Sequence, residues 1–176
     1  SGISQGKMTV EEKKTGIYLC EGCGIGEALA LDELDQLASG DLKVAVCRRH
    51  AAYCSDDGRA MIAKDIESGD VNQAIIAACS PRVMTDRFEF GGAQTVRANL
   101  REHVIWTHAA SDEDTQALAA DHLRMAVAQA SRLDPPEPQA NGAKSKKLLV
   151  VGGGVSGLSA AREAARIGVE AVLVEK

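Results

Sequence analysis

Five cysteines are the residues of this chain best able to do chemistry. Cys20 and Cys23 form a close pair in the run YLCEGCGIGEA, while Cys47, Cys54 and Cys79 stand apart from it. Thiolates bind zinc, hold iron-sulfur clusters or exchange electrons as a redox pair. By itself, the pair at 20 and 23 is compatible with a metal site, a redox site or a tight turn that contains thiols.

A cluster fits the spacing of these cysteines better than zinc does. Zinc usually takes closely spaced pairs of Cys or His, and only Cys20 and Cys23 form such a pair. An iron-sulfur cluster gathers about four thiolates from loops that can be far apart in sequence. A thioredoxin-like pair would begin a helix, whereas Gly-Ile-Gly follows Cys23 here. For Cys47 and Cys79, which end apolar runs, a role as ordinary buried residues also stays open.

Strand-like and helix-like segments alternate through the first two-thirds of the chain. Apolar runs cover 16–20, 42–47 and 71–79, and runs of helical periodicity cover 27–39 and 55–69. This rhythm predicts an α/β fold, a small Rossmann-like parallel sheet with crossover helices. A fourth strand is expected around 103–107, and a long amphipathic helix after an N-cap at Ser111 or Asp112.

The predicted sheet would bring the cysteines together. Cys20, Cys47 and Cys79 each end a predicted strand, and Cys23 and Cys54 lie in the loops that follow. The carboxyl ends of parallel strands share one edge, where ligands bind in open α/β sheets. We therefore expect the thiols to converge at that edge.

Charged and imidazole groups near the cysteines are secondary candidates. Arg48 and Arg49 follow Cys47 and could stabilise an anionic cluster or simply be solvated. His103 and His108 are weak candidate ligands, because single histidines are more often surface or core groups.

A second motif lies near the carboxyl end. Gly152, Gly154 and Gly157 follow the strand-like run KLLVV and open an alanine-rich helix, and Glu175 ends the next strand-like run. This context indicates a dinucleotide-binding β-α-β unit, in which the glycines admit a pyrophosphate and the acid binds a ribose. Because such a site needs further strands, we expect these residues alone to hold a dinucleotide weakly.

Composition and patterning divide the chain into four parts. We expect a disordered N-terminus at 1–15, an α/β domain at 16–133, a Pro-rich linker at 134–146 and the truncated start of a dinucleotide-binding domain at 147–176. A net charge of -5 argues against nucleic acid as the main partner. No apolar run approaches the roughly 20 residues that span a bilayer, and no secretory signal is evident. A cytoplasmic location is expected.

Several segments resemble one known family. GIYLCEGCG, AAYCSDDGRAMIAKDI, IIAACSPRVMTDRFE, NLREHVIWTH and LLVVGGGVSGLSAAREAARIGVEAVLVEK are similar to the amino-terminal part of HdrA, one of the subunits of heterodisulfide reductase. The resemblance covers about Gly16 to Lys176, and YCSDDG and AACSPR are its most specific pieces.

This resemblance implies a 4Fe-4S cluster in the first domain and FAD in the second. It implies that Cys23, Cys54 and Cys79 are cluster ligands. Val104 stands where the family often has a cysteine, so the fourth thiolate would be Cys20, favoured by its spacing from Cys23, or Cys47. The implied partners are other subunits of a heterodisulfide-reductase-like complex, with a possible homodimer of the full-length protein.

The function that follows is electron transfer. The cluster would relay electrons between FAD and partner subunits, and the fragment would not be catalytically active alone. The alternative is a structural zinc-binding or cysteine-redox domain of an FAD- or NAD(P)-dependent oxidoreductase.

Overall fold

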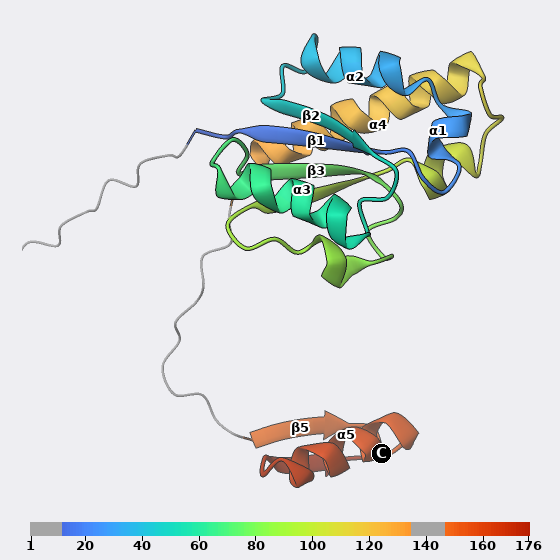
Figure 1. Cartoon of the computed structure of the whole chain (residues 1–176). Helices are drawn as coiled ribbons and strands as arrows, with labels where there is room; N and C mark the ends of the chain where they lie inside the picture. The colour runs from blue at the N-terminus through green and yellow to red at the C-terminus, as the bar shows by residue number, and fades with distance from the viewer. Residues whose placement is uncertain (1–11, 135–146) are drawn as a thin grey trace, which may run out of the picture. The chain divides into compact units, whose positions relative to one another are not determined.

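The structure is a computed structural model that describes residues 12–134 and 147–176 (Figure 1). The chain divides into two compact units between Pro135 and Pro136. Most of the expected disordered N-terminus and most of the expected linker fall on 1–11 and 135–146, which lie outside the described residues.

The first unit alternates strands and helices. Its elements are β1 (Thr15–Cys20), α1 (Ile25–Ala28), α2 (Leu31–Ser39), β2 (Val46–His50), α3 (Asp56–Glu67), β3 (Gln73–Ala78), the 3-10 turn η1 (Thr85–Phe88), β4 (Gln94–Asn99), the π-helix η2 (Arg101–Ile105) and α4 (Glu113–Arg132). The strands form one parallel sheet in the order β2-β1-β3-β4. The expected α/β fold with crossover helices is therefore confirmed.

Helices cover both faces of this sheet. Figure 1 shows α2 and α4 on one face and α3 on the other. The two central strands, β1 and β3, are buried over almost their whole length, because both faces are covered. Their apolar side chains form the centre of the core, with Ile17 of β1 opposite Ile75 of β3.

Two predicted strands are placed differently in the structure. β2 begins at Val46, so Cys47 is its second residue and does not end it. Residues 42–45 instead connect α2 to the strand, with Lys43 in the left-handed region at φ 50°. The strand expected at 103–107 was also wrong: β4 lies at Gln94–Asn99, and the following residues form η2.

Local sequence signals set the helix ends. Asp112, one of the two expected caps, caps α4, and Ser55 caps α3 by accepting a hydrogen bond from the amide of Gly58. The single helix expected at 27–39 is two helices, because Leu29 adopts an extended conformation between α1 and α2.

The first strand begins slightly earlier than expected. β1 starts at Thr15, and the Lys14 amide donates to the Asn72 side chain at 2.8 Å. Lys13 Nζ donates to the carbonyls of Ser131 and Leu133, in the last turn of α4 and just beyond it. These contacts order the residues that enter the sheet.

The second unit is one β-α-β unit. It consists of β5 (Lys147–Val151), α5 (Val155–Arg166) and β6 (Glu170–Val174), and its two strands are parallel. None of the helices within 12–134 and 147–176 has the length and apolarity needed to cross a membrane.

Candidate functional site

Four cysteines lie at the carboxyl edge of the sheet. Cys20 is the last residue of β1, Cys79 directly follows β3, Cys23 lies in the turn after β1, and Cys54 lies two residues before α3. All are free thiols. Burial raises the pKa of the Cys20 thiol, and the neighbouring Cys23 and Cys54 thiols raise it further.

Cys47 does not belong to this group. It pairs with Ile17 in the sheet register, three positions before Cys20 and its partner His50. At roughly 3.3 Å per residue, this places Cys47 about 10 Å back from the edge. Burial, followed by a hydrogen bond with Asp35 of α2, raises the pKa of its thiol to about 12. The prediction that Cys47 ends a strand at the thiol edge was wrong.

The turn that carries Cys23 has an unusual backbone. Cys23 itself adopts the left-handed conformation at φ 58°, followed by Gly24 at φ 85°. Non-glycine residues rarely do so, and the conformation costs free energy. A Cβ at Gly22 would lie 2.2 Å from the Ala51 carbonyl oxygen. The Cys23 turn therefore packs directly on the loop that leads to Cys54.

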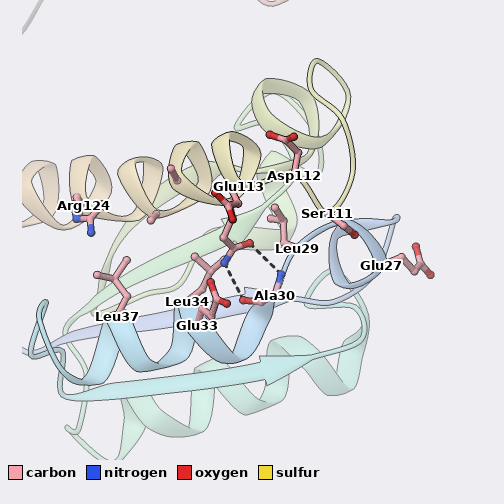
Figure 2. A pocket seen from close by; sticks show the side chains of 13 residues that line it. Glu27, Leu29, Ala30, Glu33, Leu34, Leu37, Ser111, Asp112, Glu113 and Arg124 are labelled. Carbon is pink, nitrogen blue, oxygen red and sulfur yellow. Dashed lines mark hydrogen bonds between the residues drawn. The ribbon is translucent and has the colours of Figure 1, made fainter.

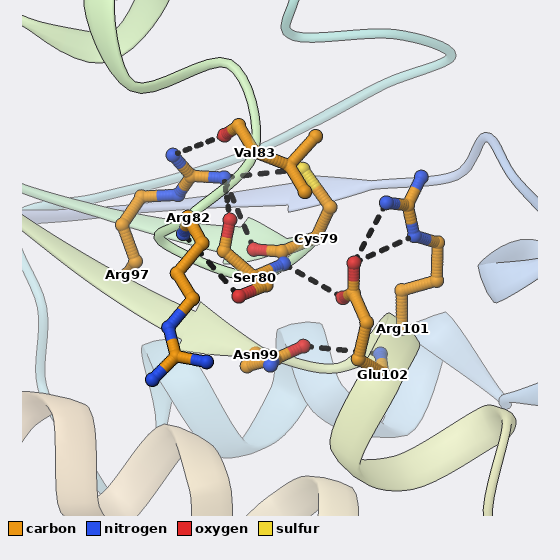
Figure 3. A network of polar contacts seen from close by, with 8 residues as sticks. All are labelled: Cys79, Ser80, Arg82, Val83, Arg97, Asn99, Arg101 and Glu102. Atoms are coloured by element: carbon orange, nitrogen blue, oxygen red, sulfur yellow. Dashed lines mark hydrogen bonds and ion pairs between the residues drawn. The ribbon is translucent and has the colours of Figure 1, made fainter. Parts of the chain in front are cut away.

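Arg97 of β4 holds the segment that contains Cys79 (Figure 3). Its Nη2 donates to the Cys79 sulfur at 3.1 Å, the Cys79 carbonyl at 3.0 Å and the Ser80 carbonyl at 3.1 Å. Its Nη1 donates to the Val83 carbonyl at 3.3 Å. The guanidinium lies 4.2 Å from the ring centroid of Phe88. One arginine thus fixes both the backbone and the thiol of this loop.

The π-helix η2 supports the same segment from the other side (Figure 3). Glu102 accepts a hydrogen bond from the Ser80 amide at 2.7 Å, and its own amide donates to Asn99 at 3.0 Å. Glu102 also pairs with Arg101 at 2.7 Å. The pKa of Arg101 is raised first by this hydrogen bond and further by one with the Cys23 thiol. Single π-helical turns occur often at functional sites.

A third arginine holds the Cys54 loop. Nε of Arg87 donates to the Cys54 carbonyl at 3.1 Å, and its guanidinium pairs with Asp56 in the first turn of α3. Arg87 and Arg97 therefore each hydrogen-bond a cysteine-bearing segment.

The arginines that the sequence suggested lie elsewhere. Arg48 binds Asp65 of α3 with two nitrogens, at 2.7 and 2.8 Å, and buried Asp65 also accepts from the Tyr18 hydroxyl. Arg49 pairs with Asp32 of α2. Both belong to the packing of helices on β1 and β2. Arg97 and Arg101 were missed because they lie far from the cysteines in sequence, and only the order of the strands brings them near.

The histidines contact other groups. The His103 ring lies 5.8 Å from the His122 ring of α4, and His108 hydrogen-bonds Thr107. In the described part of the chain, no three His, Cys, Asp or Glu side chains converge closely enough to hold a single metal ion. A cluster requires a different geometry from a single ion, because each of its four thiolates binds a separate iron atom and together they surround the whole cluster.

A groove of about 790 Å³ lies between α2 and the beginning of α4 (Figure 2). Leu29, Leu34 and Leu37 line it, with acidic side chains including Glu33 at its rim. Gln116 of α4 crosses it and exchanges two hydrogen bonds with the backbone of Ala30, each 3.0 Å. No cysteine lines this groove, so it is separate from the thiol edge.

The glycine motif forms the turn between β5 and α5. Gly152 has φ 107°, Gly154 is the N-cap of α5, and a Cβ at Gly157 would lie 1.9 Å from the Gly152 carbonyl oxygen. Glu175 follows β6, and its carboxylate accepts a hydrogen bond from the Gly153 amide. The glycine turn therefore directs the Gly153 backbone amide at an oxygen acceptor, here the Glu175 carboxylate.

Comparison with known proteins identifies relatives of the chain. No family model matches it. The HdrA-type subunit of the H(2):CoB-CoM heterodisulfide,ferredoxin reductase from Methanothermobacter marburgensis is 38% identical, over 97% of this chain and 27% of the relative. One of the HdrA-type iron-sulfur subunits of the CoB--CoM heterodisulfide reductase from Methanopyrus kandleri is also 38% identical, over 96% of this chain and 27% of the relative.

A third relative comes from another archaeon. The HdrA-like protein of Archaeoglobus profundus is 35% identical, over 96% of this chain and 25% of the relative. The chain thus spans about a quarter of the length of these curated relatives. Over nearly all of its own length, the chain is a homologue of the HdrA subunits of heterodisulfide reductase, the family that its cysteine and glycine motifs resemble.

Proposed function

We propose that the first unit is an electron-transfer module that binds one 4Fe-4S cluster through Cys20, Cys23, Cys54 and Cys79. The observation that carries this proposal is the gathering of four cysteine-bearing segments at one sheet edge, two of them held by arginine hydrogen bonds.

The donor set suits such a cluster. Four thiolates are the usual ligands of 4Fe-4S clusters, and the cationic side chains of Arg97 and Arg101 favour the negative charge that bound thiolates bring. Cys23 keeps a left-handed backbone that glycine would adopt more easily. A strained residue of this kind is retained where its side chain is needed. Bound there, the cluster would supply one-electron transfer.

The second unit supports the flavin part of the proposal. The turn of Gly152, Gly154 and Gly157 at the start of α5 would accept the pyrophosphate of FAD, and Glu175 a ribose hydroxyl. Two relatives are named as subunits of heterodisulfide reductase enzymes. We therefore propose that in the intact cytoplasmic protein, electrons pass between FAD, this site and partner subunits of such a complex.

Anaerobic reconstitution tests the proposal. The full chain, supplied with iron and sulfide under reducing conditions, should bind about four irons and four sulfides. Cys20→Ser, Cys23→Ser, Cys54→Ser and Cys79→Ser should each lower the iron content or alter the electron paramagnetic resonance (EPR) spectrum of the reduced protein. Cys47→Ser is the matched control and should match the wild type in both.

Three results would contradict the proposal. One is wild-type protein that binds no iron. Another is a chain that binds one zinc ion and no sulfide, which would favour the structural zinc domain. The last is a Cys47→Ser variant that loses iron while Cys20→Ser retains it. This result would show that Cys47, and not Cys20, supplies the fourth thiolate.

A further inference from the structure

Arg97 is a half-buried cation without a carboxylate partner in the described residues. Arg48, Arg49, Arg87, Arg101, Arg124 and Arg166 all pair with Asp or Glu side chains. Arg97 instead contacts three carbonyl oxygens, the Phe88 ring and the Cys79 sulfur, and its Nε is buried without any partner. Buried charges in proteins are usually paired or lie at metal sites.

The sulfur is the group in direct contact with Arg97 that could carry the missing negative charge. Glu102 also acts electrostatically on Arg97, but this carboxylate is already paired with Arg101. Cys79 Sγ lies 3.1 Å from Nη2, and a thiolate there would complete an ion pair in a partly desolvated position. The burial of Arg97 beside Cys79 is therefore explained if this sulfur is a ligand of the proposed cluster, because a ligand thiolate brings negative charge to the site.

Arg97 is also placed to fix the direction of the Cys79 side chain. It comes from β4, where it pairs in register with Ile76 of β3, three residues before Cys79. Nη2 of its guanidinium fork donates to the carbonyls of Cys79 and Ser80 and to the sulfur, and Nη1 donates to the Val83 carbonyl, so the backbone and the thiol are held as one unit.

We infer that Arg97 is a positioning residue that orients the Cys79 thiolate and raises the reduction potential of the site by offsetting negative charge. The inference rests on the proposed function. A one-electron reduction adds one negative charge to the group that the thiolates hold. A fixed cation against one of these thiolates favours the added charge, and hydrogen bonds to ligand sulfur act in the same direction.

The test is the midpoint potential of the reconstituted full chain, titrated with dithionite and followed by EPR. Arg97→Gln removes the charge, and the reduction equilibrium constant should fall at least tenfold, which is about 59 mV for one electron. Arg97→Lys keeps the charge without the fork, so its potential should fall between those of the wild type and Arg97→Gln.

Arg82→Gln is the matched control. Arg82 lies in the same loop, three residues after Cys79, with an exposed side chain (Figure 3). Water screens an exposed charge, so this variant should change the equilibrium constant less than threefold.

Iron analysis separates the two ideas. Wild-type protein without iron would overturn the proposed function and the inference together. Normal iron content with an unshifted Arg97→Gln potential, or with equal shifts in Arg97→Gln and Arg82→Gln, would overturn the inference alone. If Arg97→Gln does not fold or loses its iron, Arg97→Lys decides, and a wild-type potential in that variant would overturn the inference.

Discussion

Replacing Cys23 by glycine should separate the backbone cost of this residue from its chemistry. Cys23 has φ 58°, and the left-handed conformation costs a non-glycine residue roughly 1–2 kcal/mol. Glycine avoids this cost but loses about 0.5–1 kcal/mol through the greater freedom of the unfolded chain. The Cys23 side chain is exposed, so little burial is lost. The net effect on the apo protein should be a gain of between zero and about 1.5 kcal/mol.

Urea denaturation of the full chain measures this effect. Trp106, the single tryptophan, lies in the first unit, and its fluorescence reports on that unit. The Cys23→Gly midpoint should equal or exceed that of the wild type with an unchanged m value, while reconstitution should yield less iron. Lys43→Gly is the control: Lys43 is exposed at φ 50°, so this variant should gain similar stability and keep its iron.

Two outcomes would refute the reasoning. If Cys23→Gly destabilised the apo protein by more than about 1 kcal/mol, the thiol would have a structural role that outweighs the backbone cost. If the variant kept the full iron content and an unaltered EPR spectrum, Cys23 would not be a ligand.

Three further predictions concern the surroundings of the site. Asp65→Ala should lower the free energy of unfolding by about 2 kcal/mol in a urea titration, because it leaves Arg48 unpaired, although Arg48 is partly exposed. The folded chain holds the Cys47 proton more tightly than the unfolded chain, since the pKa rises from 9.0 to about 12. This stabilisation is complete below pH 9 and is lost as the pH rises towards 12. Between these pH values, the urea midpoint of the wild type should therefore fall more than that of Cys47→Ala, which lacks the thiol. Equal falls in the two proteins would contradict the raised pKa of Cys47. Gly58→Ala should reduce iron binding, because its Cβ would lie 2.4 Å from the Ala52 carbonyl oxygen in the loop before Cys54. Gly91→Ala is the control and should keep its iron, because a Cβ there would have no atom within 4 Å. Equal iron content in the two variants would contradict this prediction.

The fold was predictable where burial determines the sequence pattern. β1 and β3 are buried on both faces and therefore appear as continuous apolar runs. The cap of α4 is Asp112, one of the two residues expected there. β2 was misplaced because it is an edge strand, in which exposed Arg48 and Arg49 are tolerated and apolar periodicity is weak.

The candidate site was only partly predictable for the same reason. Cysteines are conspicuous in a sequence, and strand ends gave a rule for their convergence. Because the second strand was expected at 42–47, Cys47 was placed at its carboxyl end, whereas Cys47 is the second residue of β2. Arg97 could not be singled out, because its contact with Cys79 depends on β4 lying beside β3, and no local pattern encodes that neighbour.

The most direct test of the four-thiolate site is an iron-edge anomalous difference map from crystals of the anaerobically reconstituted chain. The account predicts one peak, or one group of merged peaks, within bonding distance of the sulfur atoms of Cys20, Cys23, Cys54 and Cys79. Iron bound at Cys47, or bound away from the carboxyl edge of the sheet, would contradict it.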